Sequence, residues 1–170
     1  MTPDHSPWIQ RTLTLWGQLS SALDSLQPAA ALAARIYVAQ AFFLSGLTKI
    51  RDWDTTIALF TDEYKVPLLP PALAAFMGTT GELVLPVMLV LGLGGRFAAL
   101  GLFIVNAMAV ASLQEIAPAA LQQHIFWGSL LAGLAIFGPG AWTLERFIWP
   151  RLANWGAKQP REMPFTMERH

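Results

Sequence analysis

The sequence predicts an all-α integral membrane protein, a four-helix bundle with an N-terminal amphipathic helix and a short interfacial helix between helices 1 and 2. Hydrophobic residues make up 54% of the chain and charged residues only 13%, against roughly 25% charged residues in an average soluble domain. The stretches 68–91, 97–114 and 125–141 share a single charged residue, Glu82. The last stretch reaches the ~20 residues of a membrane span when 121–124 are added. We therefore expect the bundle to lie in a lipid bilayer.

Composition also excludes several classes of function. The chain has no cysteine, so disulfides, iron–sulfur clusters, thiolate zinc sites and thiol redox catalysis are ruled out. Its net charge is zero, so no nucleic-acid partner is expected. No metal-ligand spacing, phosphate loop or catalytic triad occurs, and no metal site is expected.

The N-terminal segment, residues 1–28, has a helical pattern of its own. Apolar residues recur at spacings of three and four in Ile9, Leu13, Trp16, Leu19, Leu23 and Leu26. This pattern predicts an amphipathic helix over 6–27 that ends before Pro28. Two placements are open: flat on the membrane surface, as its tryptophans favour, or packed on the end of the bundle.

The transmembrane domain is expected to cover residues 29–145, followed by a basic cytoplasmic tail at 146–170. Prolines suit the first turn of a helix and glycines its end. On these signals the spans are predicted at 29–50, from Pro70-Pro71 to Gly92–Gly95, at 96–114 and at 121–137.

The segment between the first two spans resembles a loop but carries a helical face, formed by Trp53, Ile57, Phe60 and Tyr64. A short interfacial helix is therefore predicted there. One interpretation makes Trp53 and Phe60 a lid over a site, and the other makes the helix a seal on the outer end of the bundle.

The distribution of basic residues predicts the orientation. With four spans, both tails and the turn at 92–96 lie on one side of the membrane. That side holds Arg11, Arg35, Arg96, Arg146, Arg151, Lys158, Arg161 and Arg169, and the other holds Lys49, Arg51 and Lys65. Basic residues favour the cytoplasmic side, so both termini are expected in the cytoplasm.

Ionisable and amide side chains within the spans mark the candidate site. At 1.5 Å per residue, Arg35, Glu82 and Asn106 are expected in a buried layer, and Lys49 and His124 near the outer surface. Glu82 costs roughly 3 kcal/mol at mid-membrane unless a partner, a proton or water compensates it. We expect Arg35 to pair with Glu82, either to fix the helix register or as part of a ligand or proton site. All five are candidates for ligand binding or proton handling, while no catalytic residue is identified.

Three motifs carry a family resemblance. Arg35 followed by Phe42-Phe43-Leu44-Ser45-Gly46-Leu47-Thr48-Lys49 is similar to the first-helix pattern of the DoxX family. Gly81-Glu82-Leu83 with Pro86 and Leu91-Gly92-Leu93 resembles the second-helix pattern. Gly138-Pro139-Gly140 with Thr143-Leu144-Glu145 resembles the terminal pattern and departs from it conservatively at two positions.

The resemblance implies a four-helix protein of the bacterial inner membrane that is associated with oxidoreductase systems. A related subunit belongs to a thiosulfate:quinone oxidoreductase, and other relatives are linked to redox defence or to maturation of an amine dehydrogenase. Two functions remain open on this basis: a quinone-facing subunit without an intrinsic cofactor, or a non-catalytic scaffold or maturation factor for a protein partner. A carrier of ions or small molecules is the third alternative.

Overall fold

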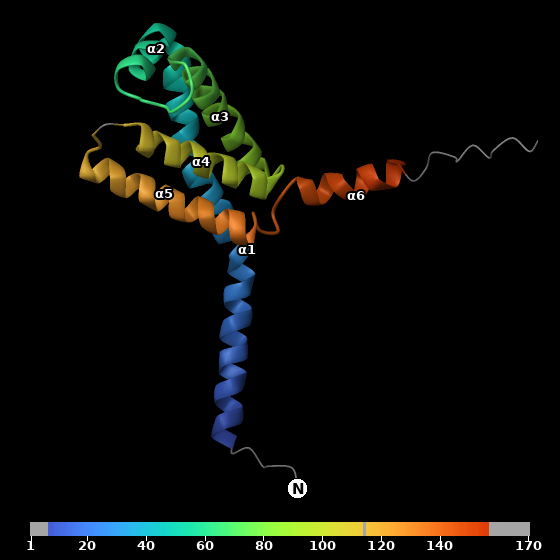
Figure 1. The fold of residues 1–170 in the computed structure, drawn as a ribbon. Coiled ribbons are helices and arrows are strands. Elements are labelled where there is room, and N and C mark those ends of the chain that lie inside the picture. The colour runs from blue at the N-terminus through green and yellow to red at the C-terminus, as the bar shows by residue number, and fades with distance from the viewer. Residues whose placement is uncertain (1–6, 114, 157–170) are drawn as a thin grey trace, which may run out of the picture.

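The computed structural model describes residues 7–113 and 115–156, with side chains to residue 151, and is helical almost throughout (Figure 1). Six helices follow one another in the described ranges: α1 (Pro7–Arg51), α2 (Trp53–Asp62), α3 (Pro71–Leu91), α4 (Gly95–Ser112), α5 (Pro118–Phe137) and α6 (Glu145–Gly156). The predicted all-α class is confirmed. The end of the predicted tail, residues 157–170, lies outside the described residues, as do residues 1–6.

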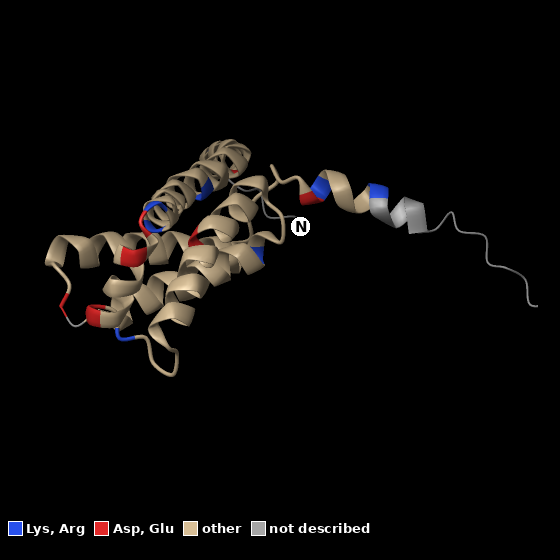
Figure 2. Cartoon of the chain, turned by 90° about the horizontal axis from the view of Figure 1, so that it is seen from above, with Lys and Arg blue, Asp and Glu red and all other residues tan. Residues whose placement is uncertain are grey.

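Four of these helices, α1, α3, α4 and α5, are long and apolar enough to cross a membrane. The second half of α1 packs on α3, α3 on α4, and α4 on α5. Their shared core includes Val38, Phe42, Leu89, Leu102 and Leu131. Large apolar side chains also point outward, where a soluble protein would carry charge, and Figure 2 shows few charged residues along the spans. The chain is therefore a multi-pass membrane protein whose outer faces suit lipid.

The break predicted at Pro28 is absent, and that prediction was wrong. The amphipathic segment continues into the first span as one helix of 45 residues. Its N-terminal part projects beyond the bundle in line with the span and does not pack on the bundle's end (Figure 1). Pro28 removes one backbone hydrogen bond, but alanines, the strongest helix formers, occupy positions 29–31 directly after it.

The predicted short helix between the first two spans is confirmed as α2. Asp52 begins it: one carboxylate oxygen accepts a 3.0 Å hydrogen bond from the Thr55 N–H and the other a 2.7 Å bond from the Thr55 hydroxyl. These bonds lower the pKa of the Asp52 carboxyl. The Thr56 hydroxyl donates back to the Lys49 carbonyl at 2.9 Å, so the chain turns sharply from α1 into α2.

The predicted ends of the remaining spans are close to those in the structure, except that α5 begins at Pro118 and not at the predicted residue 121. Pro71 and Pro118 occupy the first helical positions of α3 and α5. Gly92 ends α3 with a left-handed φ of 67°, a conformation that costs glycine little. The last helix, α6, occupies the start of the predicted tail and extends away from the bundle (Figure 1).

The close approach of α1 and α3 at Gly46 yields a testable prediction. A Cβ atom at Gly46 would lie 2.9 Å from two carbons of the Leu83 side chain and 3.2 Å from the Glu82 Cβ. Gly46→Ala should therefore lower the free energy of unfolding by about 1–2 kcal/mol, because the helices must separate or Leu83 must repack. Reversible unfolding in mixed micelles measures the change.

Gly17→Ala is the matched control for this prediction. It makes the same substitution on the same helix at a position where a Cβ meets nothing within 4 Å. Its expected effect is neutral or slightly stabilising, since alanine is the better helix former. Equal behaviour of the two variants would show that the α1–α3 contact at Gly46 is not tight.

Candidate functional site

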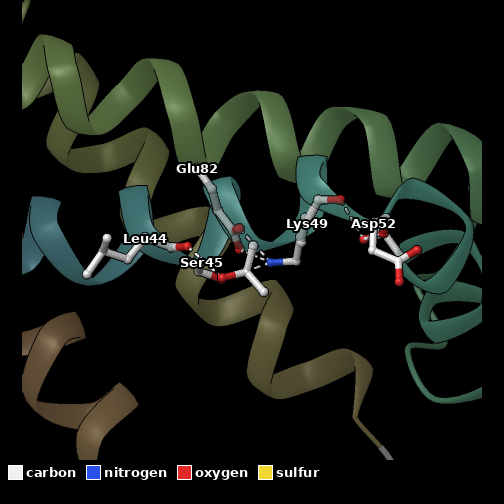
Figure 3. Close-up of polar contacts among 7 residues, drawn as sticks. Leu44, Ser45, Lys49, Asp52 and Glu82 are labelled. Carbon is white, nitrogen blue, oxygen red and sulfur yellow. Dashed lines mark hydrogen bonds and ion pairs between the residues drawn. The ribbon is translucent and has the colours of Figure 1, made fainter.

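Glu82, the only carboxylate in α3, α4 and α5, is paired with a lysine. Lys49 in α1 places its Nζ 2.7 Å and 2.5 Å from the two carboxylate oxygens of Glu82 in α3. The same ammonium donates to the Ser45 hydroxyl at 3.0 Å, one turn earlier on α1 (Figure 3). The Lys49 and Glu82 side chains are only 13% and 9% exposed. The charge of Glu82 is thus compensated by direct ion pairing between the first two spans.

The expected pair of Arg35 with Glu82 is therefore wrong. Arg35 is fully buried at the opposite end of the interface. Its guanidinium donates to the carbonyls of Leu89 and Val90 at 3.4 Å each, and to the Trp142 carbonyl at 2.6 Å. Arg35 fastens the end of α3 to the turn that follows α5. Arg35 thus lies apart from the Lys49–Glu82 pair.

The error arose from the assumed depth of the first span. Gly46 lies against Glu82, and α1 ends five residues later at Arg51, while α3 continues outward to Pro71. Lys49, which was expected to extend to the outer interface, is thus level with the middle of α3. Arg35 is three turns away from Glu82 along the same interface.

The other two predicted residues form a second polar contact, between α4 and α5. The Asn106 amide nitrogen donates to the His124 carbonyl at 3.0 Å, and the Asn106 amide oxygen lies 2.8 Å from the His124 Nδ1. The rings of His124 and Trp127 form a T-shaped pair with their centroids 5.2 Å apart. Asn106 thus donates a hydrogen bond from α4 to α5.

A pocket of about 210 Å³ opens beside the Lys49–Glu82 pair. Its walls come from α1, α2, α3, α4 and the loop before α3, and they are almost entirely apolar. The lining residues are Lys49, Phe60, Tyr64, Val66, Leu69, Ala74, Met77, Gly78, Glu82, Ile104, Val105, Met108, Ala109 and Ser112. Of the two lid candidates, Phe60 is buried and lines the pocket, whereas Trp53 is 38% exposed and does not line it.

Tyr64 is a lining residue that the sequence analysis did not name as a candidate. It follows α2, and its ring packs on that of Phe60 with the centroids 5.0 Å apart. Burial, and next the charge of Glu82, raise the pKa of the Tyr64 phenol. The next residue, Lys65, donates its backbone N–H to the Ser112 carbonyl at 2.8 Å, which holds the loop against the end of α4. Tyr64 could have been identified from the sequence, because it shares a helical face with Phe60.

The arrangement suits a small amphipathic ligand. The volume exceeds the roughly 150 Å³ of an engineered cavity that admits benzene, so a single substituted ring fits the space. Tyr64 brings an O–H donor to the pocket, and Lys49 and Glu82 bring a positive and a negative charge that are paired with each other. Within the described ranges, no three His, Asp or Glu side chains are grouped as metal ligands.

The sequence matches the model of the DoxX family over residues 30–115, a range that includes the Lys49–Glu82 pair, α2 and Asn106. No curated protein and no solved structure matched the sequence.

Proposed function

Since the match covers half of the chain, the protein belongs to the DoxX family, and we propose that it is a small quinone-facing accessory subunit of a bacterial inner-membrane oxidoreductase system. The observation that supports this proposal is the apolar pocket bordered by the Lys49–Glu82 ion pair. Ligand pockets combine an apolar lining with a few placed polar groups, and this pocket has both.

The residues present fit a quinone head group. A quinone is a flat apolar ring with carbonyl acceptors, and when bound it supplies two-electron, two-proton redox chemistry. Tyr64 is the donor available to its carbonyls, because the three N–H groups of Lys49 already bond to Ser45 and to both carboxylate oxygens of Glu82. In this proposal the chain binds the head group and handles its proton, and a protein partner in the membrane carries the electrons.

A scaffold or maturation role is the second candidate, favoured by the exposed helix before Pro28. Large apolar side chains there are more than half exposed, as at Trp8, Trp16 and Leu23. Such surfaces often bind another protein. Without a ligand in the pocket, the Lys49–Glu82 pair would serve helix packing alone.

Titration with a short-chain ubiquinone analogue separates the two functions. We expect saturable binding to the purified full chain, measured by calorimetry in nonionic detergent. Gly78→Leu should weaken binding by about tenfold or more, because the new side chain grows from the pocket wall into the ring's space. A Cβ at Gly78 itself meets only ordinary contact, with a Phe60 ring carbon 3.4 Å away.

Gly17→Leu is the matched control, since it adds the same side chain on the projecting part of α1. Its affinity for the analogue should equal that of the unchanged protein. Binding that survives Gly78→Leu would place the quinone elsewhere. Absence of saturable binding, together with a copurifying protein, would favour the scaffold role.

We also propose that both termini lie in the cytoplasm, on the basis of an excess of basic residues that is seven to two once Arg35 and Lys49, which lie inside the bundle, are left out. Reporter fusions after Gly95 and after the C-terminus should report a cytoplasmic location. Fusions in the α2–α3 loop and before α5 should report the opposite side. A C-terminal reporter outside the cytoplasm would refute this orientation.

A further inference from the structure

A second and larger cavity lies at the other end of the bundle, away from the proposed quinone pocket. Its volume is about 650 Å³, and it is formed by the middle of α1, the start of α4, the end of α5 and the start of α6. Arg96 and Arg146 are its only charged lining residues. We refer to it as the Arg96–Arg146 cleft.

The cleft is cationic. The Arg96 guanidinium lies beside the turn after α5, with Nε 3.6 Å and Nη2 3.8 Å from the position of a Cβ on Gly138. The neighbouring carboxylate, Glu145, accepts a 3.1 Å hydrogen bond from the Gly94 N–H. Among the side chains that the structure describes, neither arginine has a carboxylate within ion-pair distance. Two guanidinium groups are thus available to an anion.

The same cleft has an apolar groove between α1 and α5. Alanines 30, 31 and 34 form the α1 side, and Leu130, Gly133 and Leu134 form the α5 side. A Cβ at Gly133 would meet nothing within 4 Å, so open space lies directly over the helix at that point. Small residues on both walls leave room for a hydrocarbon chain.

The start of α6 indicates the depth of the cleft in the bilayer. Phe147, Ile148 and Trp149 are exposed beside Arg146 and Arg151. Aromatic and basic side chains together are typical of helices at the headgroup level of a membrane. The cleft therefore opens where phospholipid headgroups lie, with its groove toward the acyl chains.

We propose that the Arg96–Arg146 cleft binds one anionic phospholipid, with its phosphate on the two arginines and an acyl chain in the groove between α1 and α5. Arginine matches the geometry of phosphate oxygens and donates two parallel hydrogen bonds. Basic pockets between spans are recurrent sites for acidic headgroups. This site is independent of the proposed quinone function.

Calorimetric titration of the full chain with dioctanoyl phosphatidylglycerol in nonionic detergent tests the proposal. Arg96→Gln and Arg146→Gln should each weaken binding about fivefold, and the double variant roughly 30-fold. Gly133→Leu should weaken it by about tenfold, because leucine extends from the α5 wall into the open space of the groove. Its melting temperature in the absence of lipid should not fall, since leucine is a better helix former than glycine.

Three controls match these variants. Arg51→Gln removes an exposed arginine at the far end of α1, Gly17→Leu adds leucine where there is equal space, and Gly78→Leu fills the other pocket. All three should bind phosphatidylglycerol as the unchanged protein does. Dioctanoyl phosphatidylcholine should bind weakly to every variant.

The remaining outcomes contradict the proposal. An equal loss in Arg51→Gln and Arg96→Gln would mean nonspecific attraction of acidic lipid. Binding of inorganic phosphate with the affinity of the lipid, unaffected by Gly133→Leu, would identify a free anion as the ligand. If phosphatidylcholine bound as tightly as phosphatidylglycerol, the arginines would not select an anionic headgroup.

Discussion

Lys49→Met should lower the free energy of unfolding by about 3–5 kcal/mol, because it leaves the carboxylate of Glu82 without its partner. Lys49 Nζ contacts both oxygens of that carboxylate, and both side chains are largely shielded from solvent. Glu82→Leu should cause a comparable loss by stranding the ammonium instead. Both effects exceed those expected for most other single substitutions in the bundle. Reversible unfolding in mixed micelles provides the measurement.

The double variant Lys49→Met, Glu82→Leu separates pairing from packing. Replacement of both charges by apolar groups removes the desolvation cost along with the attraction, so stability should recover to near its original value. Arg51→Met, two residues away and exposed, should change the free energy of unfolding by no more than about 0.5 kcal/mol. Strictly additive losses in the double variant would refute an interaction between Lys49 and Glu82.

Arg35→Met should lower the free energy of unfolding by about 3 kcal/mol or more, since three carbonyls lose a charged donor in a buried place. Arg35→Lys should not restore stability, because a single ammonium cannot reproduce a planar group that spans the end of α3 and Trp142. Gly92→Ala should damage the same junction. Its Cβ would lie 2.6 Å from Thr143 at a backbone φ of 67°.

A local measurement distinguishes this junction from general instability. The chain has no cysteine, so a single Ala141→Cys provides a unique label in the turn that Arg35 holds. Maleimide should modify this thiol faster in the Arg35→Met background. In the background of Arg11→Met, an exposed residue outside the bundle, the rate should stay unchanged. An unchanged rate in both backgrounds would show that Arg35 does not hold the turn.

Sequence periodicity predicted the spans and α2 because each depends on neighbours along one helix. The partner of Glu82 depends instead on how far α1 and α3 are shifted along their axes relative to each other. Gly46 sets that level, and its contact with Leu83 cannot be read from either segment alone. The continuity of α1 is not evident from the sequence, because a proline such as Pro28 is common at the first position of a new helix.

The two cavities were predictable to different degrees. Glu82 and Phe60 were identified from their residue types and spacing, and both line the pocket beside the ion pair. The cleft could not be foreseen, because Arg96 and Arg146 are 50 residues apart. They approach one side of the bundle only through the glycine turn after α5, whose conformation the sequence pattern does not specify.

Because α1 is one continuous helix, its N-terminal part moves together with the membrane span. At 1.5 Å per residue, the part before Pro28 reaches roughly 30 Å past the bundle. A tilt of the span by about 10° would swing the far tip by roughly 5 Å. Lys49 lies near the other end of the same helix, so a tilt of α1 at the Lys49–Glu82 pair displaces Trp8. One continuous helix therefore links the Lys49–Glu82 pair to any partner that binds the exposed end of α1.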